Sequence, residues 1–151
     1  MAAKKKITKK PAKETAKPKA KPKAKSLANN IGRVGWIDLT VKDAPLVKDF
    51  YEQVVGWKIS SLDCGGYEDF CLNLPGDGST IAGVCHAVGA NAGLPPHWLV
   101  YVNVADVGKS LAKVKALGGE VVDGPRKLGD RDFACIRDPA GAFLALIEAD
   151  L

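Results

Sequence analysis

Two kinds of hydrophobic spacing follow one another along the chain and predict strands interleaved with helices. The stretch 31–41, IGRVGWIDLTV, is rich in β-branched residues and alternates in polarity, which is typical of a strand. The next segment, 46–55, spaces its large apolar residues as a helix does, at Val47, Phe50, Tyr51 and Val54. Asp43 and Pro45 suit the start of this helix and Gly56 its end.

The same order of elements recurs further along the chain. Three short strands are expected after the first helix, separated by glycine-rich turns, at 57–61, 67–74 and 80–87. A strand at 97–104 and a helix begun by Asp106 then repeat the opening pattern. Strands near 120–123, 131–137 and 142–148 complete a second β-α-β-β-β unit.

A shift of 63 residues superimposes the two units. It carries Asp43 to Asp106, Gly56 to Gly119 and Phe70 to Phe133, and the side-chain type is kept at each position. Each half alone is too small to bury a good core. We therefore expect one α+β domain over 31–151, whose modules at about 31–88 and 96–149 curl into a mixed sheet with the helices outside.

The first 30 residues have a different composition. Residues 1–26 hold eleven Lys and one acid, a net charge of +10, whereas the rest of the chain has a net charge of −5. Few large apolar residues are present, so residues 1–30 are expected to be a disordered Lys/Ala/Pro-rich tail. Lys4 to Lys25 could bind nucleic acid or another polyanion weakly and without base preference. The alternative is a spacer with no dedicated partner.

Several classes of protein are excluded by the sequence. No run of about 18 apolar residues occurs, so no membrane span is expected, and without a signal peptide we expect a cytoplasmic protein. The four cysteines form no C-x-x-C pair and are expected to be reduced structural thiols. No phosphate-binding glycine motif is present, and no cofactor is expected.

The repeat resembles the vicinal oxygen chelate superfamily, which includes glyoxalase I, bleomycin-resistance proteins and extradiol dioxygenases. The segment VGWIDLTVKDAPLVKDFYEQVVGWKI resembles that superfamily's opening strand and helix, and RDPAGAFLALIE resembles its last hairpin. The resemblance covers about residues 31–149 and implies the glyoxalase-like fold. It looks closest to a glyoxalase-like subgroup of poorly defined function.

The resemblance also implies where a metal would be held. Metal-dependent members place ligands on the first and last strand of each module, facing into a cup, where the cation polarises substrate oxygens. Here those positions carry Trp36, Leu99, Ala82 or Gly83, and Ala145, none of which has a side chain that binds a cation. The usual metal ligands are therefore missing, and no metal is expected. A soft-metal site at Cys85 and His86 with Cys64 or Cys71 is a minor alternative.

Strand alternation predicts which side chains face the cup. The expected ligand-binding residues are Trp36, Asp38, Thr40, Leu99, Tyr101, Asn103, Phe143 and His86. His86 is assigned to the cup together with Thr80, Ala82 and Val84 of the fourth strand, and Arg137 is a further polar candidate. This mixture suits an apolar or aromatic organic molecule.

Three interpretations of the cup remain open. The aromatic residues could simply pack where a metal once lay, or they could bind a small molecule without turnover. A metal-free lyase- or isomerase-like enzyme would need a general base, for which Asp38 and His86 are the candidates; no catalytic residue is assigned. The domain could also be an interaction scaffold tethered to a polyanion by its tail. A homodimer is expected because exposed edge strands favour pairing.

Overall fold

The structure, a computed structural model, describes residues 30–149, so residues 1–29 of the predicted tail lie outside the described residues. Its elements follow the predicted β-α-β-β-β order twice. They are β1 (Val34–Val41), α2 (Ala44–Val55), β2 (Lys58–Asp63), β3 (Glu68–Asn73), β4 (Thr80–His86), a 3-10 turn (Gly89–Asn91), β5 (Trp98–Val104), α3 (Val107–Ala116), β6 (Glu120–Leu128), β7 (Arg131–Arg137) and β8 (Phe143–Glu148).

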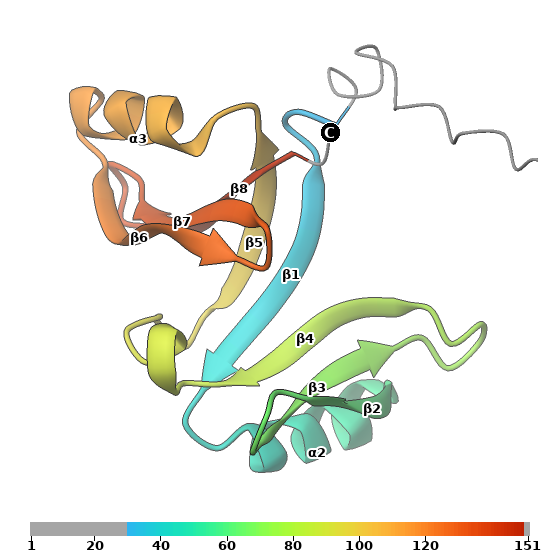
Figure 1. Ribbon diagram of the computed structural model, residues 1–151. Coiled ribbons are helices and arrows are strands. Elements are labelled where there is room, and N and C mark those ends of the chain that lie inside the picture. Colours follow the sequence, from blue (N-terminus) through green and yellow to red (C-terminus); the bar gives the residue numbers. More distant parts are fainter. Residues whose placement is uncertain (1–29, 150–151) are drawn as a thin grey trace, which may run out of the picture.

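One mixed sheet of eight strands runs through both modules, in the order β2-β3-β4-β1-β5-β8-β7-β6. The modules meet where β1 pairs antiparallel with β5, and each of these strands pairs parallel with the last strand of its own module. The sheet curls so that α2 and α3 lie on its outside, one on each module (Figure 1). The predicted α+β fold with a curled mixed sheet is confirmed.

The helix ends form where the sequence predicts them. The Asp43 carboxylate accepts a hydrogen bond of 3.0 Å from the Leu46 backbone N–H, and the Asp106 carboxylate accepts one of 2.8 Å from Lys109. Gly56 ends α2 with a φ of 83°, a left-handed conformation that a residue with a side chain rarely adopts. No helix among residues 30–149 is long and apolar enough to cross a membrane.

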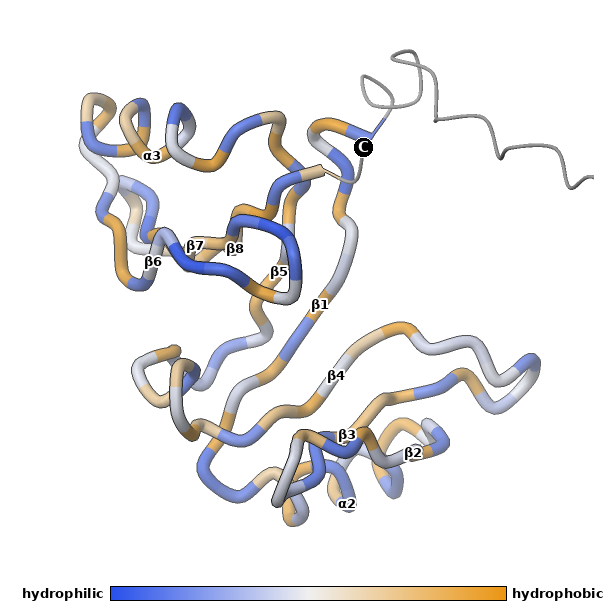
Figure 2. Tube along the Cα trace, in the orientation of Figure 1, coloured by the Kyte–Doolittle hydropathy of each residue, from blue (hydrophilic) through white to orange (hydrophobic). Residues whose placement is uncertain are grey.

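Three apolar clusters fill the interior of the protein. Under α2, Phe70, Leu72, Ala82 and Val84 form the first, and under α3 the buried Leu111, Ala134 and Leu146 belong to the second. The third lies on the opposite, concave face and contains Leu99, Tyr101, Phe133 and Ile147. Figure 2 shows that the turn between β6 and β7, which borders this face, is strongly hydrophilic.

The predicted facing of the fourth strand is wrong. Ala82 and Val84 pack beneath α2, whereas Gly83 and Cys85 face the concave side, because β4 pairs with β1 in the register Asp38 to Gly83 and Thr40 to Cys85. The sequence Ile-Ala-Gly-Val-Cys is small or apolar at every position, so its polarity does not reveal which residues face the core.

Candidate functional site

Two aromatic side chains lie next to each other at the centre of the concave face. Trp36 on β1 and Tyr101 on β5 are directly opposite one another in the antiparallel pair. Residues opposite in such a pair share a face of the sheet, which places both rings on the concave side. Tyr101 is 4% exposed, so its ring forms part of the floor.

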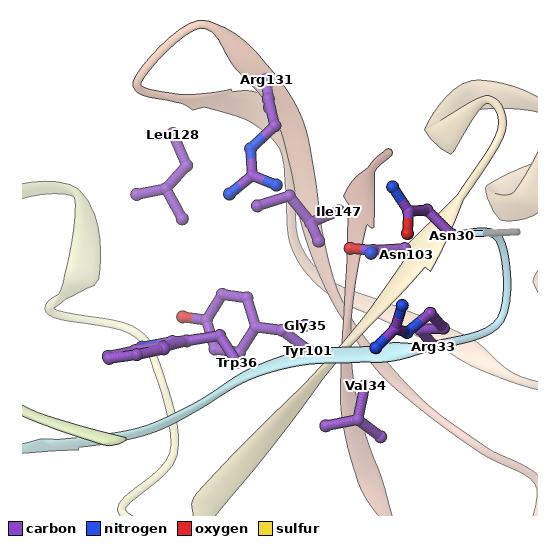
Figure 3. A pocket seen from close by; sticks show the side chains of 10 residues that line it. All are labelled: Asn30, Arg33, Val34, Gly35, Trp36, Tyr101, Asn103, Leu128, Arg131 and Ile147. Atoms are coloured by element: carbon purple, nitrogen blue, oxygen red, sulfur yellow. The ribbon is translucent and has the colours of Figure 1, made fainter. Parts of the chain in front are cut away.

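A cavity of about 370 Å³ opens against these two rings (Figure 3). Its walls come from β1, β5 and β8 and from the β6–β7 hairpin. The residues that line it are Asn30, Arg33, Val34, Gly35, Trp36, Tyr101, Asn103, Leu128, Arg131 and Ile147. Figure 3 shows Leu128 and Arg131 across the cavity from the two rings, and Asn30, Arg33 and Asn103 gathered at one end.

Asn103 gives this end of the cavity a buried polar group. Its Oδ1 atom is buried and has no hydrogen-bond partner among the described residues. A Cβ atom at Gly35 would lie 2.9 Å from that oxygen, so glycine leaves the space that the amide occupies. An unpaired buried acceptor is costly, and a ligand donor would remove that cost.

A carboxyl group lies in the floor behind Trp36. The Cys85 Sγ atom is 3.3 Å from each carboxylate oxygen of Asp38, and the thiol donates to this group. Burial raises the pKa of Asp38, and burial together with the Asp38 charge raises the pKa of Cys85 and of Tyr101. The floor therefore favours neutral, protonated groups.

A second cavity, of about 510 Å³, borders the first. It is lined by Tyr67, His86, Val88, Gly89, Ala90, Asn91, Arg126 and Leu128, and Leu128 lines both cavities. His86 Nδ1 lies 3.2 Å from Asp69 Oδ1, and the same oxygen accepts the His86 backbone N–H at 2.8 Å. Asp69 thereby fixes the imidazole, whose side chain remains 20% exposed.

Four of the eight predicted site residues line one of the two cavities, and the other four line neither. Trp36, Tyr101 and Asn103 line the first cavity and His86 lines the second. Asp38, Thr40, Leu99 and Phe143 line neither of these two cavities. Thr40 and Leu99 are buried, and Phe143 stacks on His97 with ring centroids 5.1 Å apart.

The arginines around these cavities were missed by the sequence reasoning. Arg33 and Arg131 line the first cavity and Arg126 lines the second. The candidate Arg137 lines neither cavity; its side chain is half exposed at the end of β7 and pairs with Glu120. A signal was present, because all four arginines lie in the folded part and none in the basic tail.

The residues present do not fit the metal site that the resemblance implies. The side chains of Trp36, Leu99 and Ala145 offer no atom that binds a metal. Gly83 has no side chain, and a Cβ atom added there would lie 3.5 Å from the Trp36 ring, so the ring occupies the neighbouring space. Asp38 and Cys85 are the nearest donors, and they are hydrogen-bonded to each other. Within residues 30–149 no group of three or more His, Cys, Asp or Glu side chains is placed to hold a metal ion.

Comparison with known sequences places this arrangement among proteins of one superfamily. Residues 33–146 match the Glyoxalase/Bleomycin resistance protein/Dioxygenase superfamily. CFP32 of Mycobacterium tuberculosis, named as a candidate glyoxylase, is 32% identical over 123 residues, which are 81% of this chain and 46% of CFP32. The anthracycline biosynthesis protein DnrV of Streptomyces peucetius is 26% identical over 117 residues, 78% of this chain and 42% of DnrV. The chain thus spans slightly less than half the length of these relatives.

A solved structure shares the architecture of this chain. A hypothetical protein from Bacillus halodurans, BH1468, aligns with a TM-score of 0.51 at 15% identity, covering 80% of this chain and 96% of that one. Methylmalonyl-CoA epimerase from Mycobacterium tuberculosis aligns with a TM-score of 0.47 at 16% identity, covering 76% and 86%. The likeness to BH1468 agrees with the fold described above.

Proposed function

Because this chain belongs to the glyoxalase/bleomycin resistance protein/dioxygenase superfamily, we propose that its concave face binds an organic small molecule. The observation that carries the proposal is the cavity of about 370 Å³ that opens on Trp36 and Tyr101. Its size lies within the range of small-molecule sites, roughly 300–1,000 Å³. An aromatic or apolar ring would stack against Trp36, with Asn103 as a polar contact at the other end.

The names of the relatives agree with this proposal. A glyoxylase and an anthracycline biosynthesis protein both act in the chemistry of small organic molecules. Both relatives are about twice as long as this chain, so their full activities are not transferred to it.

The binding proposal is tested with neutral aromatic probes. Ligand-observed NMR of the full chain with indole, 2-naphthamide and anthraquinone should reveal at least one saturable binder. Trp36→Leu should abolish its binding because the stacking surface is lost. Leu62→Ser is the control, since Leu62 is 54% exposed on β2, outside the cavity. No saturable binding, or binding that Trp36→Leu leaves unchanged, would contradict the proposal.

Binding is proposed to need no metal. The positions implied for ligands hold tryptophan, leucine, glycine and alanine, so side-chain donors are lacking there. Elemental mass spectrometry of the full chain, purified without chelator, should find less than about 0.1 equivalent of any transition metal. A stoichiometric metal would overturn this part of the proposal and direct attention to Asp38 and Cys85.

His86 supports a second candidate function, metal-free proton transfer. Asp69 holds its Nδ1 side, which leaves Nε2 on the opposite side of the ring as an acceptor, and the residue lines the second cavity. Asp38, the other base considered from the sequence, lines neither cavity. A bound probe with an acidic C–H bond should exchange deuterium from solvent, and His86→Gln should stop that exchange. Exchange that persists in this variant would rule out the role.

The basic tail supports a third proposal, weak binding of polyanions by Lys4 to Lys25, which lie outside the described residues. Eleven lysines within 26 residues would replace counterions along a phosphate backbone. Binding of the full chain to double-stranded DNA should fall steeply with salt and show no base preference. Affinity that is insensitive to salt would contradict it.

We also propose that two copies of the chain pair through α2. Leu46, Phe50 and Val54 are 65%, 55% and 64% exposed and form a stripe along the helix, next to an apolar groove of about 590 Å³. The 63-residue repeat places Lys109 and Lys113 of α3 where α2 has Leu46 and Phe50, so only one outer helix is apolar. Lys48, Asp49 and Glu52 bring both signs of charge to α2, which suits a surface that meets its own copy.

A further inference from the structure

The positive charges around the concave face all come from arginine. Arg33 and Arg131 line the first cavity and Arg126 lines the second, so three of the four arginines in the chain face the two cavities. None of the lysines among residues 30–149 lines either one. The guanidinium group is planar and presents paired donors that match a carboxylate, whereas the lysine ammonium is a point charge.

Acidic side chains are excluded from the same surface. Residues 30–149 carry 15 Asp and Glu against 11 Lys and Arg, yet no Asp or Glu lines either cavity. The carboxyl group nearest the two rings is that of Asp38, which lies in the floor and is hydrogen-bonded to Cys85. Burial raises its pKa, which makes this carboxyl group easier to protonate. An acidic domain therefore presents a locally basic pocket.

The arginines differ in whether their guanidinium groups already pair with other residues of the protein. Arg126 donates from Nε to Asp123 at 2.7 Å and from Nη2 to Asn91 at 2.8 Å, and its guanidinium carbon lies 4.6 Å from the Phe133 ring centroid. Arg126 is thereby fixed and partly neutralised. Arg33 makes no ion pair with any residue of the described part of the chain, and its guanidinium lies at the polar end of the first cavity (Figure 3). Arg33 is thus the arginine that carries the inference.

The lining favours a carboxylate over a phosphate. Phosphate sites commonly use the backbone N–H groups at a helix N-terminus or in a glycine-rich loop. Neither α2 nor α3 contributes a residue to the first cavity, whose walls are strands and turns. Guanidinium groups together with aromatic rings suit a flat organic acid.

From these observations we infer that the natural ligand is a planar organic carboxylate. Its ring lies against Trp36 and Tyr101, and its carboxylate points toward Arg33 and Arg131. This inference rests on the proposed function, since it names the ligand class of the same cavity.

Two probes of nearly identical shape test the inference. 2-Naphthoate carries a carboxylate where 2-naphthamide carries a neutral amide, and both are titrated into the full chain by calorimetry at low salt. We expect 2-naphthoate to bind about tenfold more tightly, as a charged hydrogen bond at a partly exposed site allows. In Arg33→Gln the preference should fall to about twofold. In Arg137→Gln, which changes an exposed arginine that lines neither cavity, it should stay at about tenfold.

Salt provides a second measurement that needs no variant. The preference for 2-naphthoate should shrink as the salt concentration rises, while the affinity for 2-naphthamide should stay constant. Equal binding of both probes at low salt would overturn the inference and leave the proposed function standing. Tighter binding of 2-naphthyl phosphate than of 2-naphthoate would overturn the choice of carboxylate. If neither naphthalene probe binds, and the other neutral aromatic probes do not bind either, the proposed function itself fails.

Discussion

The thiol of Cys85 lies 3.3 Å from both carboxylate oxygens of Asp38, although 47 residues separate them in sequence. The parallel pairing of β1 with β4 brings them together on the concave face. Burial is the main cause that raises the pKa of Asp38, and the Cys85 hydrogen bond opposes it. The concave face thus holds, next to the cavity but not in its lining, a carboxyl group that folding makes easier to protonate.

Replacing Asp38 with asparagine should change how stability depends on pH. The pKa of Asp38 is raised in the folded chain, so between its ordinary value of 3.8 and its folded value the folded state binds more protons than the unfolded state. Its contribution to stability therefore falls as pH rises through this window. The free energy of unfolding of Asp38→Asn, relative to wild type, should rise from pH 4 toward neutrality and then level off.

Asp77 supplies a control of opposite sign. Hydrogen bonds from the Ser79 side chain and backbone lower its pKa, so its contribution is present above 3.8 and is lost as pH falls. Asp77→Asn should therefore lose stability relative to wild type as pH rises. Chemical denaturation from below pH 3 to neutrality covers the windows of both groups, and equal slopes for the two variants would contradict the account.

A methyl group at Gly83 should disturb the floor of the cavity. A Cβ atom there would lie 2.5 Å from Asp38 Oδ1, closer than real contacts allow. We expect Gly83→Ala to lower the free energy of unfolding by about 1–3 kcal/mol, the usual range for overpacking. Gly76→Ala is the control, because its Cβ would meet no atom within 4 Å. Similar stability of the two variants would show that the carboxyl group can move aside.

The cysteines should differ in their rates of alkylation. Burial raises the pKa of Cys135 to about 11, and burial with the Asp38 charge also raises that of Cys85. The thiolate is the reactive form, and the pKa of Cys64 is raised as well, but its thiol is the least buried of the three, so iodoacetamide at pH 8 should label Cys64 first. Mass spectrometry of timed samples measures the order, and denaturant should remove the difference. Labelling of Cys85 as fast as Cys64 in the native chain would be incompatible with the geometry of the floor.

The apolar stripe on α2 predicts the behaviour of a double variant. Leu46→Lys with Phe50→Lys gives α2 the outer face that α3 already has at Lys109 and Lys113. This change should convert a dimer into a monomer in sedimentation velocity without lowering the free energy of unfolding of the monomer, because both side chains are largely exposed. Leu117→Lys is the matched control, at an exposed leucine that directly follows α3. A wild-type chain that sediments as a monomer would refute the proposed pairing.

Much of the fold could be predicted because the sequence contains the same β-α-β-β-β pattern twice. The capping residues Asp43 and Asp106 mark equivalent starts of the two helices, and the structure confirms them. The ends differ, because Gly56 caps α2 whereas α3 already ends at Ala116 with Leu117 as its C-cap. The facing of β1 and β5 was also predictable, since Asp38 and Asn103 interrupt otherwise apolar strands.

The rest of the site depends on packing that periodicity does not record. The register between β4 and β1 decides which β4 side chains face the concave side. The centre of β4 has no polar residue from which this could be predicted. The arginines enter the site from two different places, Arg33 from just before β1 and Arg131 from the start of β7. Only the curled sheet brings them to one cavity, and a linear pattern cannot express that curvature.

The most direct test of the account follows the three indole N–H signals of the ¹⁵N-labelled full chain as 2-naphthoate and 2-naphthamide are added. Trp36 lines the proposed cavity, whereas Trp57 and Trp98 lie with Tyr51 in the cluster beneath α2. The Trp36 signal should shift in a saturable way with at least one probe, while the other two stay in place. Shifts confined to Trp57 or Trp98, or binding of either probe that leaves the Trp36 signal in place, would contradict binding on the concave face.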